Sequence, residues 1–230
     1  MAPLTLHHAH PWHVAPEDAL RIQEQLSRHI REEPLSHAIR TVGGVDVGVK
    51  DERSRAAIVV VEYSTWRVMH TATYEMATPF PYIPGLLSFR EVPVILGALE
   101  RLPSLPDVLL CDAQGRAHPR RLGLASHLGV LLDHPTVGCA KRRLTGHHPP
   151  VPNRRGAWVP LMDNGDVIGA VVRTRAGVKP VYVSVGHRIT LEEAIKLVLD
   201  TATRYRLPDP IRLAHRLSQS PSPGDRLFPD

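Results

Sequence analysis

The amino-acid sequence predicts an α/β protein in which a mixed central β-sheet is flanked by helices. Three strand-like runs joined by short turns, at residues 41–49, 55–63 and 66–76, predict an antiparallel meander. Farther on, strand and helix patterns alternate over residues 106–140, which is typical of a parallel crossover unit. The chain has 230 residues, 43% of them hydrophobic, so one domain with a full core accounts for its whole length, 1–230.

Helices are indicated by apolar side chains spaced three and four residues apart. Pro16 followed by such a pattern predicts a helix over residues 16–31, since proline favours the first helical position. Residues 123–132 form the helix of the crossover unit. Thr190 and Glu193 make a capping box ahead of an apolar stripe, which is the clearest helix start in the chain.

A further helix is predicted after the proline-rich loop TPFPYIPG. Apolar side chains from Phe89 to Leu102 fall on one side of it. Because proline disrupts a helix interior, Pro93 is expected in the first turn, which leaves Glu91 at the helix mouth. A carboxylate there is favoured by the helix dipole whether or not it has a catalytic role.

The remaining strands and the two ends complete the predicted organisation. Strands are expected at residues 106–111 and 135–140, and two or three more between residues 157 and 185, after a basic loop. The first 14 residues contain four histidines and no apolar period, and residues 219–230 are rich in Ser, Pro and Gly. Both ends are therefore expected to be poorly ordered.

Composition argues against several classes of protein. The longest apolar run, residues 56–61, is far shorter than the roughly 18 residues of a membrane helix, and no secretion signal is recognised. Lys and Arg number 28 against 23 Asp and Glu, and the net charge of +5 favours a polyanionic partner. Cys111 and Cys139 are too few for a disulfide framework, so we expect buried free thiols and a cytoplasmic protein without membrane association.

The run GGVDVGV at residues 43–49 places an acid inside a strand. A period of two puts Gly44, Asp46 and Gly48 on one face, so the carboxylate stands between two residues without side chains. A buried acid needs a partner or a metal, and glycine within a strand often marks close approach by a ligand or another backbone. A solvent-facing acid on an edge strand explains the pattern equally well.

Two further candidates end neighbouring strands. Asp112 follows the apolar run VLLC, and Lys141 follows TVGCA. In open sheets with crossover helices, sites gather at the carboxyl ends of the parallel strands. The simpler interpretations are a turn-initiating aspartate and a surface lysine.

Asp46, Glu91 and Asp112 together suit a hard divalent cation, because carboxylate oxygens are the ligands that Mg²⁺ and Mn²⁺ prefer. Mg²⁺ usually keeps several positions for water and phosphate, so a phosphate group is the implied substrate. The Lys141 ammonium would then lie close enough to hold a phosphate or to orient the nucleophile.

With these motifs in place, the chain resembles endonuclease V, a family of nucleases with a ribonuclease H-like fold. The resemblance covers most of the chain and keeps the order of the family's motifs. The matching blocks are GGVDVGV (43–49), PYIPGLLSFRE (81–91), DAQGRAHPRRLGLASHLGV (112–130), TVGCAKRRLTG (136–146), VYVSVGHRI (181–189) and YRLPDPIRLAH (205–215).

The resemblance implies a magnesium-dependent nuclease of DNA repair, in which Mn²⁺ can replace Mg²⁺. The family hydrolyses the second phosphodiester bond 3′ to deoxyinosine, the product of adenine deamination. By resemblance, Asp46 and Asp112 are metal ligands and Glu91 is the third acid of the site. Lys141 matches the family's active-site lysine, and His215 matches a C-terminal position where the family has His or Asp.

The resemblance also implies a wedge that enters the DNA duplex at the lesion. It corresponds to Pro81, Tyr82, Ile83 and Pro84. The prolines stiffen the loop, and the Tyr82 ring can stack on exposed bases and fill the space left by an extruded nucleotide.

A flipped base needs a pocket that recognises its edge, which the family builds largely from main chain. The candidates for this pocket are Gly85, Leu87, Gly115, His118 and Gly138. Ala113 stands beside them where the family usually has glycine. The candidates for phosphate contacts are Arg90, Arg120, Arg121 and Arg142. For Ser184 and His187, support of a loop and contact with nucleic acid are equally open.

The leading hypothesis is therefore an endonuclease that acts on DNA containing deoxyinosine. Inosine-directed cleavage of RNA is a close alternative, since contacts with the 2′-hydroxyl leave no motif. A damaged-DNA-binding module without catalysis is the third, and it is disfavoured because desolvated carboxylates near phosphate are costly to keep. A monomer is expected.

Overall fold

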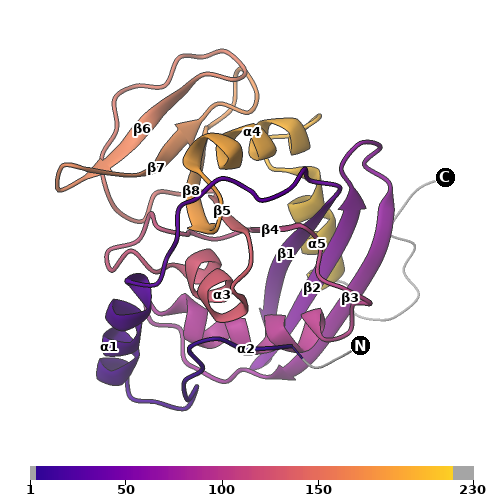
Figure 1. Ribbon diagram of the computed structural model, residues 1–230, viewed down its shortest axis with the longest axis vertical. Coiled ribbons are helices and arrows are strands. Elements are labelled where there is room, and N and C mark those ends of the chain that lie inside the picture. The colour runs from indigo at the N-terminus through magenta and orange to yellow at the C-terminus, as the bar shows by residue number, and fades with distance from the viewer. Residues whose placement is uncertain (1–3, 220–230) are drawn as a thin grey trace.

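The computed structural model describes residues 4–219, and it confirms the α/β class with a mixed central sheet (Figure 1). The strands of this part of the chain are β1 (Thr41–Lys50), β2 (Arg53–Glu62), β3 (Val68–Ala77), β4 (Val108–Cys111), β5 (Thr136–Ala140), β6 (Trp158–Asp163), β7 (Asp166–Val172) and β8 (Val181–His187). They form one sheet in the order β3-β2-β1-β4-β5-β8-β7-β6. The predicted meander is β1 to β3, and the predicted parallel pair is β4–β5. In addition, β1 pairs in parallel with β4, which joins the two predicted parts of the sheet.

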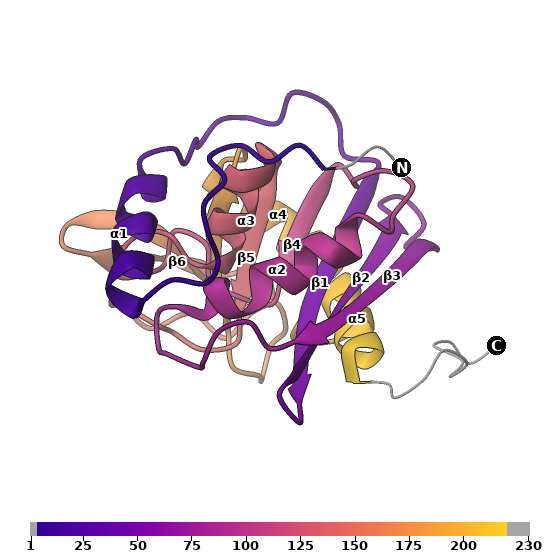
Figure 2. The ribbon, with the colours of Figure 1, turned by 90° about the horizontal axis from the view of Figure 1, so that it is seen from below.

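Helices cover both faces of this sheet, as Figures 1 and 2 show. They are α1 (Pro16–Ser27), α2 (Leu87–Leu99), α3 (Leu124–Leu132), α4 (Leu191–Thr201) and α5 (Asp209–Gln219). On one face α2 and α3 pack with Val45 and Ile58, and on the other α4 and α5 pack with Val42 and Val59. α1 lies outside α2 and α3 and contacts both through apolar side chains.

Two predictions about helices need correction. α2 begins at Leu87, so Glu91 is not at the helix mouth but at the fifth helical position, and Pro93 lies inside the helix. The missing N–H of Pro93 is tolerated there because the apolar face of α2 is buried in the core. α1 ends at Ser27, earlier than expected, whereas the capping box of Thr190 and Glu193 is confirmed.

The N-terminal segment also differs from its prediction. Residues 4–14 form no regular element, but they are packed rather than poorly ordered. The Trp12 ring stacks on His127 with their centroids 5.4 Å apart, and the two Nε2 atoms of His10 and His127 lie 2.7 Å apart. The backbone N–H of His7 donates to the carbonyl of Leu131 at 2.7 Å. The parts of the two terminal predictions that concern residues 1–3 and 220–230 lie outside the described residues.

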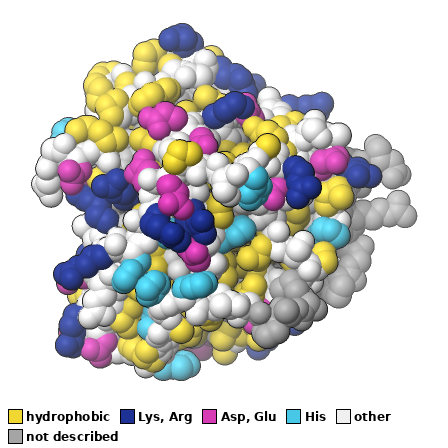
Figure 3. Space-filling model, in the orientation of Figure 1, with side chains coloured by type: hydrophobic (Ala, Val, Ile, Leu, Met, Phe, Trp, Pro, Cys, Tyr) yellow, Lys and Arg dark blue, Asp and Glu magenta, His cyan; other side chains and the backbone are white. Residues whose placement is uncertain are grey.

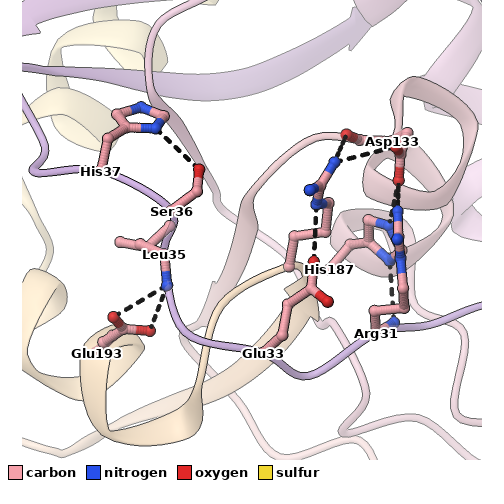
Figure 4. A network of polar contacts seen from close by, with 9 residues as sticks. Arg31, Glu33, Leu35, Ser36, His37, Asp133, His187 and Glu193 are labelled. Atoms are coloured by element: carbon pink, nitrogen blue, oxygen red, sulfur yellow. Dashed lines mark hydrogen bonds and ion pairs between the residues drawn. The ribbon is translucent and has the colours of Figure 1, made fainter.

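The connector between α1 and β1 is fixed by a network of charged residues (Figure 4). Asp133, at the end of α3, accepts hydrogen bonds from Arg31, His187 and Arg188. Although burial acts to raise it, the pKa of Asp133 is lowered to about 2 by these hydrogen bonds and positive charges. His187 also accepts from the backbone N–H of Arg31 at 3.2 Å, so its observed contacts are those of a loop support.

The close approach of α5 to β1 depends on glycine. A Cβ added at Gly44 would lie 2.1 Å from the carbonyl carbon and oxygen of Pro210, and one at Gly48 would lie 2.6 Å from Nε2 of Gln219. The glycines on either side of Asp46 therefore make room for another segment of backbone, which is one of the two explanations that the sequence allowed. This contact places the C-terminal half of α5 beside Asp46.

Gly44→Ala is expected to destabilise the protein by about 3 kcal/mol, because the added methyl meets main chain that can move only with the whole helix. Gly177→Ala is the control: nothing lies within 4 Å of its Cβ, although its φ of +77° adds strain of about 1 kcal/mol. Urea unfolding followed by circular dichroism measures both. Equal losses in the two variants would contradict the described contact.

Candidate active site

Three separate elements bring the predicted acids to one place. Asp46 lies on β1, Asp112 follows the last residue of β4, and Glu91 lies on α2. All three line a single cavity of about 80 Å³. The rest of its wall is apolar and is formed by Val45, Val47, Leu87, Ile95, Ala113 and Leu124. Carboxylates in such surroundings interact strongly, because little water is present to screen their charges.

Asp46 is buried and held by α5. Its side chain is 8% exposed, and β1 lies between β2 and β4, so the alternative of a solvent-facing acid on an edge strand is wrong. The Ser218 hydroxyl donates to the Asp46 carboxylate at 2.6 Å, and Nδ1 of His215 lies 3.2 Å from the same oxygen. The sequence prediction that placed His215 near the acids thus agrees with its position, and Ser218 is an additional partner.

Asp112 and Lys141 form an ion pair at the ends of the adjacent strands β4 and β5. Burial raises the pKa of Asp112, even though the Lys141 ammonium acts to lower it. The backbone carbonyl of Lys141 accepts a hydrogen bond from Arg206 at 2.6 Å, which fixes the chain where β5 ends. Lys141 is therefore a cation with an anchored backbone and a partly exposed side chain, close to the acids.

Glu91 has no hydrogen-bond or ion-pair partner within residues 4–219. Burial raises the pKa of Glu91 to about 8, and the negative charges of Asp46 and Asp112 add to this effect while Arg90 opposes it. At neutral pH the side chain therefore keeps its proton for most of the time.

The donor chemistry of this cavity fits a hard divalent cation, although the residues are not gathered into a finished metal cluster. In the described part of the chain, no three His, Cys, Asp or Glu side chains are arranged as a set of metal ligands. Asp46 is engaged by α5 and Asp112 by Lys141 instead. The oxygen ligands that Mg²⁺ prefers are nevertheless all at one cavity, where burial first and the charges of Asp46 and Asp112 next raise the pKa of Glu91.

A larger cavity of about 600 Å³ adjoins the first and shares Leu87, Asp112, Ala113 and Leu124 with it. Three of the four proposed wedge residues line it: Tyr82, Ile83 and Pro84. Pro81 lies with Tyr82 at a neighbouring hollow. The Tyr82 side chain is 67% exposed, which is unusual for an aromatic residue, and the Arg90 guanidinium lies 5.8 Å from the centre of its ring.

Three of the five candidates for the base pocket line the larger cavity: Gly85, Leu87 and His118. Gly115 and Gly138 do not, and they lie behind it. A Cβ at Gly138 would be 2.3 Å from the nitrogen of Gly115, and one at Gly115 would be 2.2 Å from the carbonyl oxygen of Val185. Ser184 accepts from the Gly115 N–H at 2.9 Å and so supports this loop. The two glycines bring the loop after β4 against β5 and β8, and their assignment to the base pocket stays a prediction.

The candidate phosphate-binding arginines differ in whether their side chains already have partners within the protein. Arg142 and its neighbour Arg143 are exposed, line the larger cavity and form no ion pair within residues 4–219. Arg121 is paired with Asp163 at 2.7 Å, and Arg120 donates to backbone and side-chain acceptors inside the protein. Arg142 is therefore the best placed of the predicted set to meet a phosphate.

Other arginines are neutralised by acids. Figure 3 shows that Lys and Arg side chains are scattered among acidic ones on the face seen in Figure 1, with several histidines in the lower half. Arg31 and Arg188 both pair with Asp133, and Arg116 pairs with Glu32 at 3.0 Å. The net charge of +5 is thus not gathered into a basic surface on the described part of this face.

Two residues of the site region were missed in the sequence. Ser218 follows His215 by three residues, which places both side chains on one side of a helix, but α5 itself was not predicted. Gln23 is 1% exposed and lies on the apolar side of α1 between Ala19 and Leu26. A polar residue on the buried stripe of an amphipathic helix is a signal that could have been used.

Carboxylates that share a cavity beside a lysine, where the parallel strands β4 and β5 end, are suited to the hydrolysis of a phosphodiester bond. Together, fold and site define a nuclease. The family model of endonuclease V matches residues 24–216. The chain belongs to the endonuclease V family, and the enzyme class expected from the sequence is confirmed.

Individual relatives agree over nearly the whole chain. Endonuclease V of Trichormus variabilis is 48% identical over 221 residues, which cover 94% of this chain and 100% of that protein. The crystal structure of endonuclease V from Streptomyces avermitilis is 41% identical, with a TM-score of 0.86 over 90% of this chain and 92% of that one. The Ciona intestinalis enzyme, in complex with a 23mer DNA containing an inosine followed by a ribo-adenosine, is 27% identical, with a TM-score of 0.77 over 89% and 97%.

The raised pKa of Glu91 predicts how stability depends on pH without metal. From pH 4.5, where a glutamate of the unfolded chain titrates, up to about 8, the folded protein keeps a proton that the unfolded chain loses, so stability falls as pH rises. The slope reaches at most about 1.4 kcal/mol per pH unit. Glu91→Gln removes this contribution while keeping the shape of the side chain.

Urea unfolding of both proteins at pH 5, 6.5 and 8 in EDTA measures the effect. Relative to Glu91→Gln, the protein with Glu91 should lose stability steadily over this range. Asp112 titrates in both proteins, so the difference between them isolates Glu91. Parallel pH profiles would show that Glu91 is ionised throughout.

Proposed function

We propose that the protein is a DNA repair endonuclease that hydrolyses the second phosphodiester bond 3′ to deoxyinosine and depends on Mg²⁺. The observation that carries the proposal is the junction of two cavities. The small one holds the three acids, the large one begins at the exposed Tyr82, and Asp112 lines both. The inosine-containing DNA in the Ciona intestinalis complex supports the choice of substrate.

In this proposal base recognition, phosphate binding and metal binding are carried out by different residues of the chain. Tyr82 stacks in the duplex at the lesion, and the flipped base occupies the larger cavity. Arg142 and Arg143 contact phosphates, and the Lys141 ammonium holds the scissile phosphate or orients the attacking water. Asp46, Glu91 and Asp112 would hold Mg²⁺, or Mn²⁺ in its place, and such a metal supplies Lewis-acid stabilisation of charge on phosphate.

The substrate is tested with labelled duplexes that differ in one base. Purified protein with Mg²⁺ should nick the strand that contains deoxyinosine, one nucleotide beyond the base on its 3′ side, and leave the matched undamaged duplex intact. EDTA should abolish the nick. Equal cutting of both duplexes would contradict the proposal, as would no cutting in Mg²⁺.

Asp46→Asn is expected to lower the cleavage rate roughly a thousandfold, because one anionic ligand is lost at the reacting phosphate. Binding of the lesion in Ca²⁺ should persist, since Asp46 does not line the larger cavity. Asp51→Asn, in the exposed turn of the same hairpin, is the matched control and should be unaffected. Cleavage rates and gel-shift affinities are measured for both variants. Full cleavage activity of Asp46→Asn would contradict the assignment of Asp46 as a metal ligand.

Tyr82→Ala is expected to reduce the preference for deoxyinosine duplex over undamaged duplex roughly tenfold or more, the size of a lost base–aromatic stack. Tyr205→Ala provides the control, because Tyr205 is also an exposed tyrosine but stacks on Arg212 away from both cavities. The preference is measured as the ratio of dissociation constants in Ca²⁺. An unchanged ratio would show that Tyr82 is no wedge.

Inosine-directed cleavage of RNA is the second candidate. It is favoured by the ribo-adenosine that follows the inosine in the DNA of the Ciona intestinalis complex. Rates on DNA and RNA strands of matched sequence separate the two candidates. A faster rate on RNA would make inosine-containing RNA the substrate, while the assignment of the active-site residues would stay the same.

A monomer that acts in the cytoplasm completes the proposal. Among residues 4–219, none of the helices combines the length and the apolarity that a membrane span requires. Cys111 and Cys139 are both free and buried, as expected for thiols in a reducing compartment. Light scattering of the purified protein tests the monomeric state, which would be wrong if the measured mass were twice 25.5 kDa.

A further inference from the structure

The segment that carries the proposed wedge is anchored at one backbone carbonyl, that of Gly85. Three side-chain donors converge on its oxygen: Nε2 of Gln23 at 3.0 Å, Nε2 of His118 at 3.0 Å and Nη2 of Arg120 at 2.9 Å. A carbonyl oxygen has two lone pairs, so its capacity is fully used. Gly85 has a φ of +83°, and a Cβ there would lie 2.8 Å from Nη2 of Arg120, so glycine lets the donors come this close.

Gln23 ties these donors together. Its Oε1 accepts from Nε of Arg120 at 2.7 Å, and its Nε2 also donates to the carbonyl of Leu122 at 3.2 Å. The side chain is 1% exposed, and burying an amide is costly unless both of its ends are satisfied, as they are here. α1 thereby contacts the wedge segment through a polar group.

The state of His118 agrees with its role as a donor. Burial and the positive charge of Arg120 lower the pKa of His118 to about 4, so the ring is neutral at pH 7. Its Nδ1 accepts from the backbone N–H of Arg120 at 3.2 Å, which leaves the proton on Nε2 to point at Gly85. All three donors are therefore matched to one acceptor.

We propose that Gln23 is a positioning residue that acts on the wedge: through the Gly85 carbonyl and Arg120 it holds residues 81–84 where Tyr82 can enter a duplex. The inference rests on the proposed function and goes beyond it, because it assigns part of the lesion recognition to α1. Gln23 lies just before the range, residues 24–216, that the family model matches. It lines the larger cavity but not the cavity of the three acids.

The proposal separates opening of the duplex from the chemical step. A duplex must be opened before the base can leave its stack, whereas a single strand needs no wedge. Loss of the anchor should therefore harm cleavage of a duplex much more than cleavage of a single strand. A residue that touched the base, or that merely maintained the fold, would affect both substrates alike.

The test compares Gln23→Met with Gln25→Met, a change of the same residue type at an exposed position of the same helix. Gln23→Met should lower kcat/KM on duplex deoxyinosine DNA roughly tenfold, while the value on the single strand stays within about twofold. Gln25→Met should change neither. Gln23→Asn, which keeps the amide but is too short to reach Gly85, should behave like Gln23→Met and serves if the latter does not fold.

Equal losses on duplex and single strand would overturn the proposal, as would no loss on the duplex. A second measurement does not depend on the proposed function: hydrogen exchange of residues 80–88 in the DNA-free protein should be faster in Gln23→Met than in Gln25→Met or the unaltered protein. Unchanged exchange would refute the anchoring. If the unaltered protein cut neither DNA, the proposed function would fall, and the exchange measurement would still decide whether Gln23 holds this segment.

Discussion

The repulsion among three carboxyl groups at one small cavity is the constraint on which the site depends. The carboxyl groups of Asp46, Glu91 and Asp112 line one cavity and are shielded from solvent, so they cannot all be ionised unless positive charge or hydrogen-bond donors compensate them. Each is relieved differently: Asp46 by donors on α5, Asp112 by Lys141, and Glu91 by a proton. In the proposed function a divalent cation would replace the proton of Glu91, which would couple binding of the metal to ionisation of the site.

The fold meets this constraint by bringing backbones unusually close. Gly44 lets α5 lie on β1, which carries His215 and Ser218 to Asp46. Gly85 does the same for the wedge segment, because its carbonyl is within reach of three donors. Asp46 and the wedge segment are thus held by different helices, α5 and α1, on opposite sides of the sheet. The contacts of Asp46 can therefore be altered without touching the anchor of the wedge segment.

Much of this arrangement follows from local patterns in the sequence. The positions of Asp46, Asp112 and Lys141 were predictable because strand periodicity and strand ends are local features, and the meander and the crossover unit also follow from local patterns. The pairing of β1 with β4 and of β5 with β8 depends on how the whole sheet assembles. The position of Glu91 within α2 was predicted wrongly, because core packing overrides the local penalty of Pro93 inside a helix. Ser218 and Gln23 could not be assigned partners, since their contacts depend on how whole helices dock.

The most direct test of the account is a crystal structure with Mn²⁺ and an inosine-containing strand, in which anomalous scattering locates the metal. We expect Mn²⁺ at the small cavity, bound by carboxylate oxygens of Asp46 and Asp112, with Glu91 ionised at the same site and the inosine base in the adjoining larger cavity. Mn²⁺ found only elsewhere, for example at the N-terminal histidines, would contradict it.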